Sequence, residues 1–450
     1  SANCLHATTD ILQAVASARH MLKPGGVLIL IEMVERPRWL DMIADGLEGV
    51  FEEIAELESR DTGKPISLAR SVDASRSVAN FRFFAGLLLE QETEFFQMED
   101  ATNYVVNKPV GVGALITPWN LPLYLLSWKV APAIGMGNTV VCKPSELTPM
   151  TADLLMRVID GVGLPPGVIN LVHGEGAGAG EPLVSHPDVD LVSFTGGTST
   201  GEKVAASAAP MFKKISLELG GKNASIVFAD CNMESTVEGV VRSGFLNQGQ
   251  VCLCGSRILV EDGIYDEFER RFVESVEKMT IGDPLDESSD LGALISPEHL
   301  EKVRSYIDLA KEEGGTILTG GTPCLPSRFD GGNWISPTVI GGLEYDSRCA
   351  TEEILGPVVS LHRFDSEEEA IEIANCTRYG LAGSVWTEDL EKGKRVSERI
   401  DSGMIWINTW LHRDLRVPFG GVKDSGVGRE GGRWSLGFFS EAMNICVKQG

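Results

Sequence analysis

The chain has 450 residues, 43% of them hydrophobic and 23% charged, which is typical of a globular enzyme large enough for two or three domains. Its 39 Lys and Arg stand against 64 Asp and Glu, and the resulting formal charge of −25 disfavours roles on nucleic acid or on an anionic membrane surface. No apolar run approaches the roughly 20 residues of a membrane-spanning helix, no secretory signal is visible, and nine dispersed cysteines indicate free thiols in a reducing compartment. We therefore expect a cytoplasmic protein with no metal site.

The first element in chain order is a helix end, a turn and a buried strand in HMLKPGGVLILIEMVE, residues 20–35. Together with NCLHATTD at residues 3–10, it resembles the late part of an S-adenosylmethionine-dependent methyltransferase domain of the polyketide synthase type. The cofactor-binding half of such a domain is not present, so residues 1–40 are expected to be a fragment without methyltransferase activity. An arbitrary helix, turn and strand is the alternative interpretation.

Short apolar strands then alternate with helical stretches. Strands are predicted within residues 111–120, 139–146, 168–174 and 191–197, and a helix over residues 151–162. The strands end in polar or glycine-rich turns, an arrangement that favours an open parallel α/β sheet with functional residues at the strand ends.

A second α/β pattern begins at about Ala224. Its predicted strands are SIVF, RILV, GSVW and GMIWIN, and an amphipathic helix covers residues 266–279. This pattern predicts a second α/β domain, with the catalytic groups between the two.

Three turns carry residues suited to thiol chemistry. Cys252 ends GQVC, Asn120 ends TPWN, and Glu218 precedes two glycines in ELGGK. A reactive cysteine needs a thiolate, donors for an oxyanion and a base, and these residue types supply each of them. Taken singly, each residue is also compatible with a turn, a cap or a packed core position, and the nearby Cys254 is a second candidate thiol.

Two further turns are suited to a nucleotide. GGTSTG, with Gly196, Thr198 and Gly201, follows a strand and opens a helix, which is a favourable place for a pyrophosphate. KPSE offers Lys143 and Glu146 to ribose hydroxyls, although a solvated ion pair in a turn is the alternative.

The ordered motifs together are far more specific than any one of them. TPWN, KPSE, FTGGTSTG, ELGGK, GQVC, EEILGPV and PFGGVKDSG resemble, in this order, the aldehyde dehydrogenase superfamily, from about Asp41 to the C-terminus. The resemblance implies an α/β fold with a Rossmann-type NAD-binding domain, an α/β catalytic domain and a small β oligomerisation element. The implied segments are 41–92 and 110–220 for NAD binding, 221–424 for catalysis, and 93–109 and 435–450 for oligomerisation.

The same resemblance implies roles for the residues. Cys252 is the nucleophile, Asn120 and the Cys252 backbone N–H stabilise the oxyanion, and Glu218 is the general base, whereas Cys254 is a packed neighbour. NAD is the implied cofactor, since a carboxylate at Glu146 would repel the additional phosphate of NADP. The implied cofactor contacts are Thr117, Trp119, Lys143, Glu146, Gly196, Thr198, Gly201 and Glu353. A homodimer or homotetramer is implied as well, through Tyr104–Pro109 and Ile445–Lys448.

Substrate choice is indicated by two stretches. VDASRSVANFRFFAG, residues 72–86, and NTWLHRDLRVPFGG, residues 408–421, resemble the branch of the family that acts on 2-aminomuconate and 2-hydroxymuconate semialdehydes. There two arginines, Arg76 and Arg413 here, hold the substrate carboxylate, a role suited to the planar fork of Arg. The expected reaction is NAD-dependent oxidation of such a small semialdehyde to its acid. The alternatives are another aldehyde dehydrogenase, a thiol esterase that does not use NAD, and an inactive or non-catalytic relative with an altered N-terminus.

Overall fold

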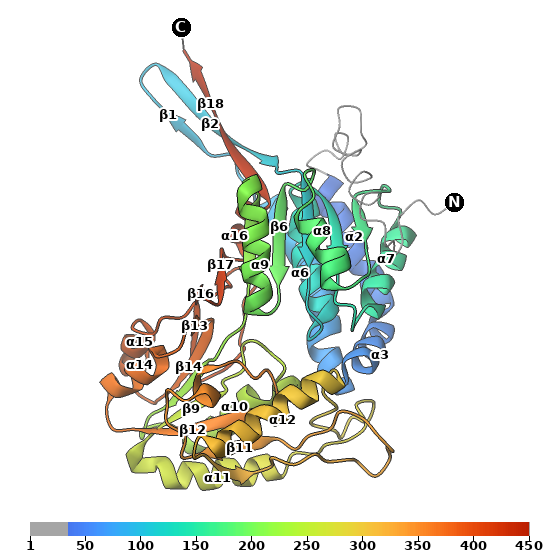
Figure 1. The fold of residues 1–450 in the computed structure, drawn as a ribbon. Helices are drawn as coiled ribbons and strands as arrows, with labels where there is room; N and C mark the ends of the chain where they lie inside the picture. The colour runs from blue at the N-terminus through green and yellow to red at the C-terminus, as the bar shows by residue number, and fades with distance from the viewer. Residues whose placement is uncertain (1–34, 450) are drawn as a thin grey trace.

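Residues 35–449 are described by a computed structural model of the chain, in which two α/β sheets lie one above the other and a β ribbon projects from the upper end (Figure 1). The methyltransferase-like stretch expected in residues 1–40 lies almost entirely outside the described residues. Within the described range, no helix combines the length and the apolar character that crossing a bilayer requires.

The first sheet has six strands in the order β17-β7-β6-β3-β4-β5. All neighbours are parallel except β17, which is antiparallel to β7. The strands β3, β4 and β6 are buried along their whole length, as expected for a parallel sheet that is covered on both faces. The bounds are β3 Val112–Ile116, β4 Thr139–Lys143, β5 Ile169–Leu171, β6 Leu191–Thr195, β7 Lys214–Glu218 and β17 Gly426–Val427.

Helices cover both faces of this sheet because alternate strand residues point to opposite sides. Leu115 and Val140 pack among the helices of one face, whereas Ala114 and Val141 pack on the other. The first face is covered by α2 (Glu35–Gly49), α3 (Phe51–Thr62), α5 (Ser75–Leu89), α6 (Pro122–Gly135) and α7 (Met150–Val162), and the second by α8 (Glu181–Val184) and α9 (Thr198–Ala208). Between α3 and α5 lie the short α4 (Ile66–Leu68) and the π-helix η2 (Ala69–Ala74).

The second sheet has seven strands in the order β10-β11-β12-β9-β8-β14-β15, and only β10 is antiparallel to its neighbour. Its bounds are β8 Ala224–Val227, β9 Arg257–Glu261, β10 Thr316–Thr319, β11 Thr338–Gly341, β12 Val358–Phe364, β14 Ala382–Trp386 and β15 Met404–Ile407. The helices α10 (Met233–Phe245) and α11 (Tyr265–Glu277) pack on one face, and α14 (Glu367–Asn375) and α15 (Leu390–Ser397) on the other. Beyond them lie α12 (Pro297–Glu312) and α13 (Arg348–Thr351), which belong to a separate small core.

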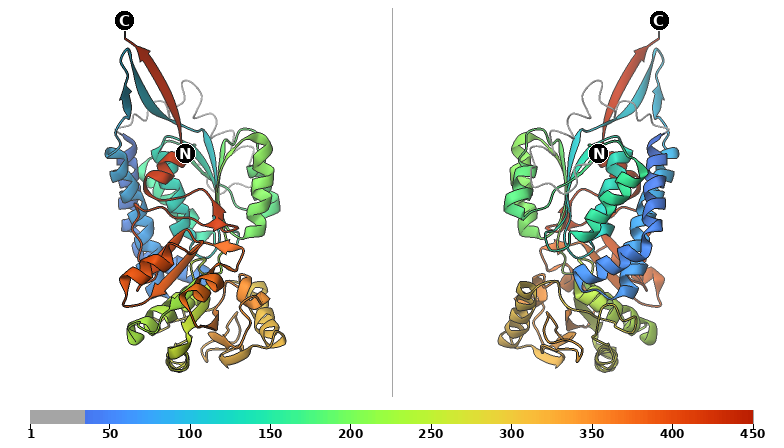
Figure 2. Two further views of the ribbon diagram at one scale, coloured as in Figure 1. Left: turned by 90° about the vertical axis from the view of Figure 1, so that its left-hand side faces the viewer. Right: turned by 90° about the vertical axis from the view of Figure 1, so that its right-hand side faces the viewer.

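The β ribbon consists of β1 (Phe95–Gln97), β2 (Ala101–Pro109) and β18 (Ser440–Lys448). The strand β18 pairs with β2 along its full length, and Ile445 lies opposite Tyr104. The ribbon extends away from both sheets in every view (Figure 2). A short helix, α16 (Gly432–Phe438), precedes it.

The connection between the sheets determines where a site forms. The chain leaves the first sheet at Glu218, the last residue of β7, and enters the second at Ala224, the first residue of β8. The carboxyl ends of the first sheet therefore face the amino ends of the second. In the first sheet the strand order reverses beside β3, because β4 and β5 lie on one side of it and β6 and β7 on the other. Ligands of open α/β sheets bind at such a reversal.

Candidate active site

A cavity of about 270 Å³ opens at the junction of the two sheets. Asn120 lines it from the turn after β3, Glu218 from the end of β7, and Cys252 from the loop between α10 and β9. The structure therefore brings together the three residues to which the sequence assigned catalytic roles, although they are far apart along the chain.

The two neighbouring thiols have different surroundings. Cys252 lines the cavity and is partly exposed, whereas Cys254 is 6% exposed and packs within the hydrophobic core of the second sheet. Burial raises the pKa of the Cys252 thiol, and the carboxylates of Glu353 and Glu218 raise it further. The thiol is thus protonated near neutral pH, and its reaction requires a base.

The side-chain amide of Asn120 is held in a defined orientation. Its Oδ1 accepts a hydrogen bond from the backbone N–H of Leu121 at 3.1 Å, and its Nδ2 donates to the carbonyl of Gln250 at 2.9 Å. An amide nitrogen carries two hydrogens. The second hydrogen of Nδ2 is available to an oxygen in the cavity, on the side of the loop that carries Cys252.

Glu218 is 3% exposed, and neither of its carboxylate oxygens has a hydrogen-bond partner among the described residues. Burial raises its pKa well above the usual range, and the carboxylate of Glu430 adds to the rise, while Lys129, Arg429 and Arg413 oppose it. Lys129 forms an ion pair with Glu430 at 2.6 Å. A carboxylate whose pKa is raised is a stronger base and is suited to take a proton from water.

A second cavity of about 620 Å³ adjoins the first, and Trp119 and Gly196 line both. Thr117, Lys143 and Glu146 line the second cavity, and Lys143 Nζ donates to Glu146 Oε2 at 2.9 Å. Thr198 and Gly201 do not line it: they belong to the first turn of α9, where Gly201 packs against Leu219.

A nucleotide fits what lines this second cavity. The buried hydroxyl of Thr117 has no partner among the described residues, and the cavity adjoins Gly197, the N-cap of α9. A helix N-terminus favours phosphate, and at Gly196 a Cβ would come within 2.5 Å of the Phe194 ring. At Gly196 and Gly197 the backbone therefore lines the cavity without side chains, at the place where a pyrophosphate would lie.

Glu353 lines the smaller cavity and accepts a hydrogen bond from the backbone N–H of Gly221 at 3.0 Å. A Cβ on Gly220 would come within 2.4 Å of the Glu353 carboxylate, so the glycines of ELGGK make room for this side chain. Burial raises its pKa. Leu355 also lines the cavity, with a left-handed φ of 59°.

Arg76 and Arg413 line the same cavity. Arg413 Nη1 donates to the hydroxyl of Tyr124, and the guanidinium lies 4.0 Å from the centre of the Phe419 ring and 4.6 Å from that of Trp128. Its buried Nε and Nη2 have no hydrogen-bond partner within residues 35–449. Arg76 Nη2 donates to the backbone carbonyl of Arg413 at 3.3 Å.

Several residues of the site were not anticipated from the sequence. Tyr124 and Trp128 are four residues apart within α6, so a helix predicted there would have placed them on one face, just after the turn that holds Asn120. Lys129 and Glu430 lie far apart in sequence, and no local pattern indicates that they pair.

The two sheets place a cysteine, an amide and a buried carboxylate in one cavity, with a larger phosphate-compatible cavity beside it, which is the arrangement that a dehydrogenase with a catalytic thiol would need. The chain belongs to the aldehyde dehydrogenase family, whose sequence model matches residues 4–445. This match confirms the predicted family and its α/β fold. It also runs through most of residues 1–40, for which the methyltransferase resemblance stays a prediction.

The relatives include 2-aminomuconic semialdehyde dehydrogenase of Mus musculus, 52% identical over 419 residues that cover 92% of this chain and 86% of the relative. The 2-hydroxymuconic semialdehyde dehydrogenase of Pseudomonas sp. (strain CF600) is 48% identical over 447 residues, 98% of this chain and 91% of the relative. Among solved structures, betaine aldehyde dehydrogenase from Staphylococcus aureus in complex with NAD+ superimposes with a TM-score of 0.94 at 38% identity, covering 99% of this chain and 88% of that one.

Proposed function

We propose that this chain oxidises a carboxylate-bearing semialdehyde, of the 2-aminomuconate or 2-hydroxymuconate type, to the corresponding acid with NAD as the oxidant. The observation that carries the proposal is the state of Arg413: this residue lines the cavity, and two of its guanidinium nitrogens, Nε and Nη2, are buried without a partner in the described part of the chain. A guanidinium buried against two aromatic rings is costly unless an anion completes its hydrogen bonds. A substrate carboxylate supplies that anion.

The chain's own residues divide the chemistry between them. The Sγ proton of Cys252 passes to Glu218, the carboxylate in the same cavity, which releases it to solvent before the second step. The Sγ then adds to the aldehyde carbon, and the carbonyl oxygen takes the negative charge of a thiohemiacetal. Asn120 Nδ2 and the Cys252 backbone N–H donate to this oxygen, and each such donor is worth roughly 3–4 kcal/mol. Loss of the carbon-bound hydride leaves a thioester. Glu218 then removes a proton from water, which attacks the thioester and releases the acid and the thiol.

NAD supplies the hydride acceptor when it is bound. Of the residues predicted from the sequence, those proposed to contact it from the larger cavity are Thr117, Trp119, Lys143, Glu146 and Gly196. Glu353 is proposed to contact it from the smaller cavity. Thr198 and Gly201, which do not line either cavity, are proposed to shape the first turn of α9 on which its pyrophosphate lies. Support comes from the cavity beside the N-terminus of α9 and from the related betaine aldehyde dehydrogenase structure with NAD+.

The proposal includes the division into NAD-binding segments 41–92 and 110–220, a catalytic segment 221–424, and oligomerisation segments 93–109 and 435–450. A homodimer or homotetramer joined through the ribbon β1-β2-β18 is part of it. Large apolar side chains lie exposed on that ribbon, and water-exposed apolar clusters favour association; they are Phe95, Phe96, Tyr104, Ile445 and Val447. A cytoplasmic location is proposed because the eight described cysteines are all free.

The test is NADH formation with a panel of aldehydes, each carboxylate-bearing semialdehyde paired with a neutral aldehyde of similar length. We expect kcat/KM to be highest for the carboxylate-bearing members with NAD. A preference for the neutral partners would refute the proposed substrate class. Cleavage of activated esters without any NAD reduction would refute the proposed reaction.

A further inference from the structure

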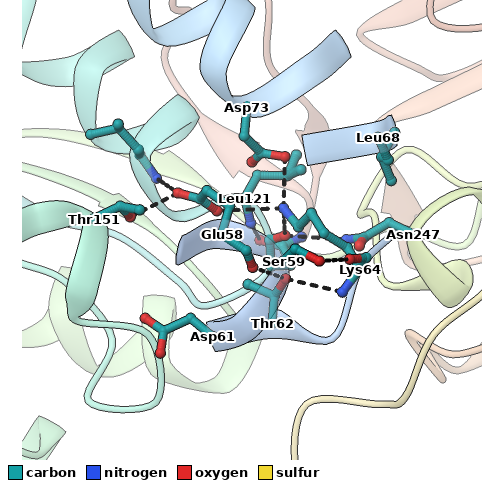
Figure 3. A network of polar contacts seen from close by, with 12 residues as sticks. Glu58, Ser59, Asp61, Thr62, Lys64, Leu68, Asp73, Leu121, Thr151 and Asn247 are labelled. Carbon is teal, nitrogen blue, oxygen red and sulfur yellow. Dashed lines mark hydrogen bonds and ion pairs between the residues drawn. The ribbon is translucent and has the colours of Figure 1, made fainter. Parts of the chain in front are cut away.

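Lys64 is a lysine with no solvent exposure, in the turn that follows α3. Its Nζ donates to Asp73 Oδ2 at 2.8 Å and lies 3.6 Å from Glu58 Oε2 (Figure 3). It also donates to the backbone carbonyl of Asn120 at 3.0 Å. Both carboxylates are fully buried as well. Taking three charges out of water costs several kcal/mol per ion, and apolar side chains would fill the same space at no such cost.

The contact with Asn120 lies at the point that orients its side chain. The carbonyl of Asn120 accepts from Lys64 Nζ and also from Asn247 Nδ2 at 3.1 Å. The N–H of the same peptide unit, that of Leu121, donates to Asn120 Oδ1. Because a peptide unit is planar, holding its carbonyl fixes the direction of its N–H. The N–H in turn holds Oδ1, so that Nδ2 faces the loop of Cys252.

The same turn contacts two other parts of the site. Asp73 belongs to the π-helix η2 and lies three residues before Arg76. The carbonyl of Gly63, next to Lys64, accepts from Gln248 Nε2 at 3.1 Å, which connects the turn to the loop that carries Cys252. The ammonium of Lys64 therefore lies where three parts of the site come together: Asn120, the segment that leads to Arg76, and the loop that carries Cys252.

We propose that Lys64 is a positioning residue for aldehyde oxidation: its ammonium holds the peptide between Asn120 and Leu121 so that the Asn120 amide faces the oxyanion. This inference rests on the oxyanion role proposed for Asn120. The carboxyl groups of Glu58 and Asp73 lie beside the ammonium, at 3.6 and 2.8 Å. Burial raises the pKa of Asp73 to about 7, and the charge of Lys64 opposes the rise. Glu58 is itself anchored, since its Oε1 accepts from the backbone N–H of Leu123 and from Thr151 Oγ1.

The test separates positioning from stability. Lys64→Met leaves two buried carboxylates unpaired, so it lowers both the melting temperature and kcat. Lys64→Met/Asp73→Asn restores the net charge of the cluster, so we expect the melting temperature to recover. We expect kcat to stay lower than that of the wild type by on the order of ten-fold or more, which is a fraction of the loss caused by removing an oxyanion donor. Thr151→Val is the matched control: it removes a hydrogen bond from Glu58, lowers the melting temperature and leaves kcat near that of the wild type.

A kcat that recovers together with the melting temperature would overturn the inference, because Lys64 would then be structural only. Asn247→Gly gives an independent check that disturbs no buried charge. Asn247 has a left-handed φ of 54°, which glycine adopts freely, and the change removes the other donor to the Asn120 carbonyl. We expect kcat to fall several-fold, and an unchanged kcat would contradict the inference.

Two measurements test the role of Lys64 separately from the proposed substrate. Adding Lys64→Met/Asp73→Asn to Asn120→Ala should produce almost no further loss of kcat, since both changes remove the same interaction; additive losses would count against it. All comparisons use a neutral aldehyde. If the wild type prefers neutral aldehydes, the carboxylate-bearing substrate is refuted while the effect of Lys64 is still measured.

Discussion

Replacing Arg413 by glutamine tests the substrate assignment most directly. Two nitrogens of the guanidinium, Nε and Nη2, are buried without a partner in residues 35–449, and a hydrogen bond from each to a carboxylate is charge-assisted. Such bonds contribute about 1.5–3 kcal/mol apiece. Their joint loss amounts to about 3–6 kcal/mol, and we expect kcat/KM for a carboxylate-bearing semialdehyde to fall on the order of 10²- to 10⁴-fold.

A neutral aldehyde is the internal control. Arg413→Gln also removes the bond to Tyr124 and the stacking on Phe419, but those losses affect every substrate alike. The assay is the ratio of kcat/KM between the two aldehydes, followed as NADH formation. Arg413→Lys keeps the charge and loses the fork, so its ratio should lie between those of the wild type and the glutamine variant. Equal falls for both aldehydes in Arg413→Gln would refute the carboxylate assignment.

Two further outcomes are expected. Cys252→Ala abolishes aldehyde oxidation, whereas Cys254→Ala retains most of it because its sulfur packs in the core; the reverse result would assign the nucleophile to Cys254. Glu146→Gln removes a carboxylate that lines the larger cavity. The ratio of kcat/KM with NAD to kcat/KM with NADP should fall by about five-fold, because one exposed charge pair contributes about 1 kcal/mol. An unchanged ratio of kcat/KM for the two cofactors would show that Glu146 does not discriminate between them.

The parts of the molecule that follow from local pattern were predictable. The apolar runs before TPWN, KPSE and FTGG form β3, β4 and β6, since a parallel strand buried on both faces reads as an uninterrupted apolar run. Polar residues at the ends of such strands converge at one edge of a sheet. The position of Asn120 beside the cavity follows from this geometry.

Buried charges were not predictable in this way. Lys64 and Asp73 are residue types that usually lie on the surface, and a rule that places apolar residues inside the protein predicts them to be exposed. In the structure both are fully buried. Their partner, the carbonyl of Asn120, lies 56 residues beyond Lys64 in the sequence. Only the folded chain brings the ammonium, the carboxylate and that carbonyl within hydrogen-bonding distance. The same holds for Arg413, which is half-buried against rings from two separate segments.

The proposed roles of Arg413 and Glu218 predict a link between substrate binding and the base. The positive charge of Arg413, with those of Lys129 and Arg429, opposes the rise in the pKa of Glu218 that burial and Glu430 cause. We expect a substrate carboxylate bound to Arg413 to cancel that charge and to raise the pKa of Glu218 further. Glu218 would then be a stronger base when the substrate is bound.

Arg413→Gln should reproduce this effect without any carboxylate. Glu218 acts when ionised, so the rate of deacylation rises as the pH passes through its pKa. A higher pKa therefore moves this rising part of the pH–rate profile to more alkaline pH. The measurement is single-turnover hydrolysis of an acyl-enzyme formed from an activated neutral ester, in which Cys252 is already acylated and does not titrate. Arg270→Gln, an exposed arginine on α11, is the control. If the rising part of the pH–rate profile stays at the same pH in both variants, the charge of Arg413 does not affect the pKa of Glu218. The role of Arg413 is then confined to holding the carboxylate.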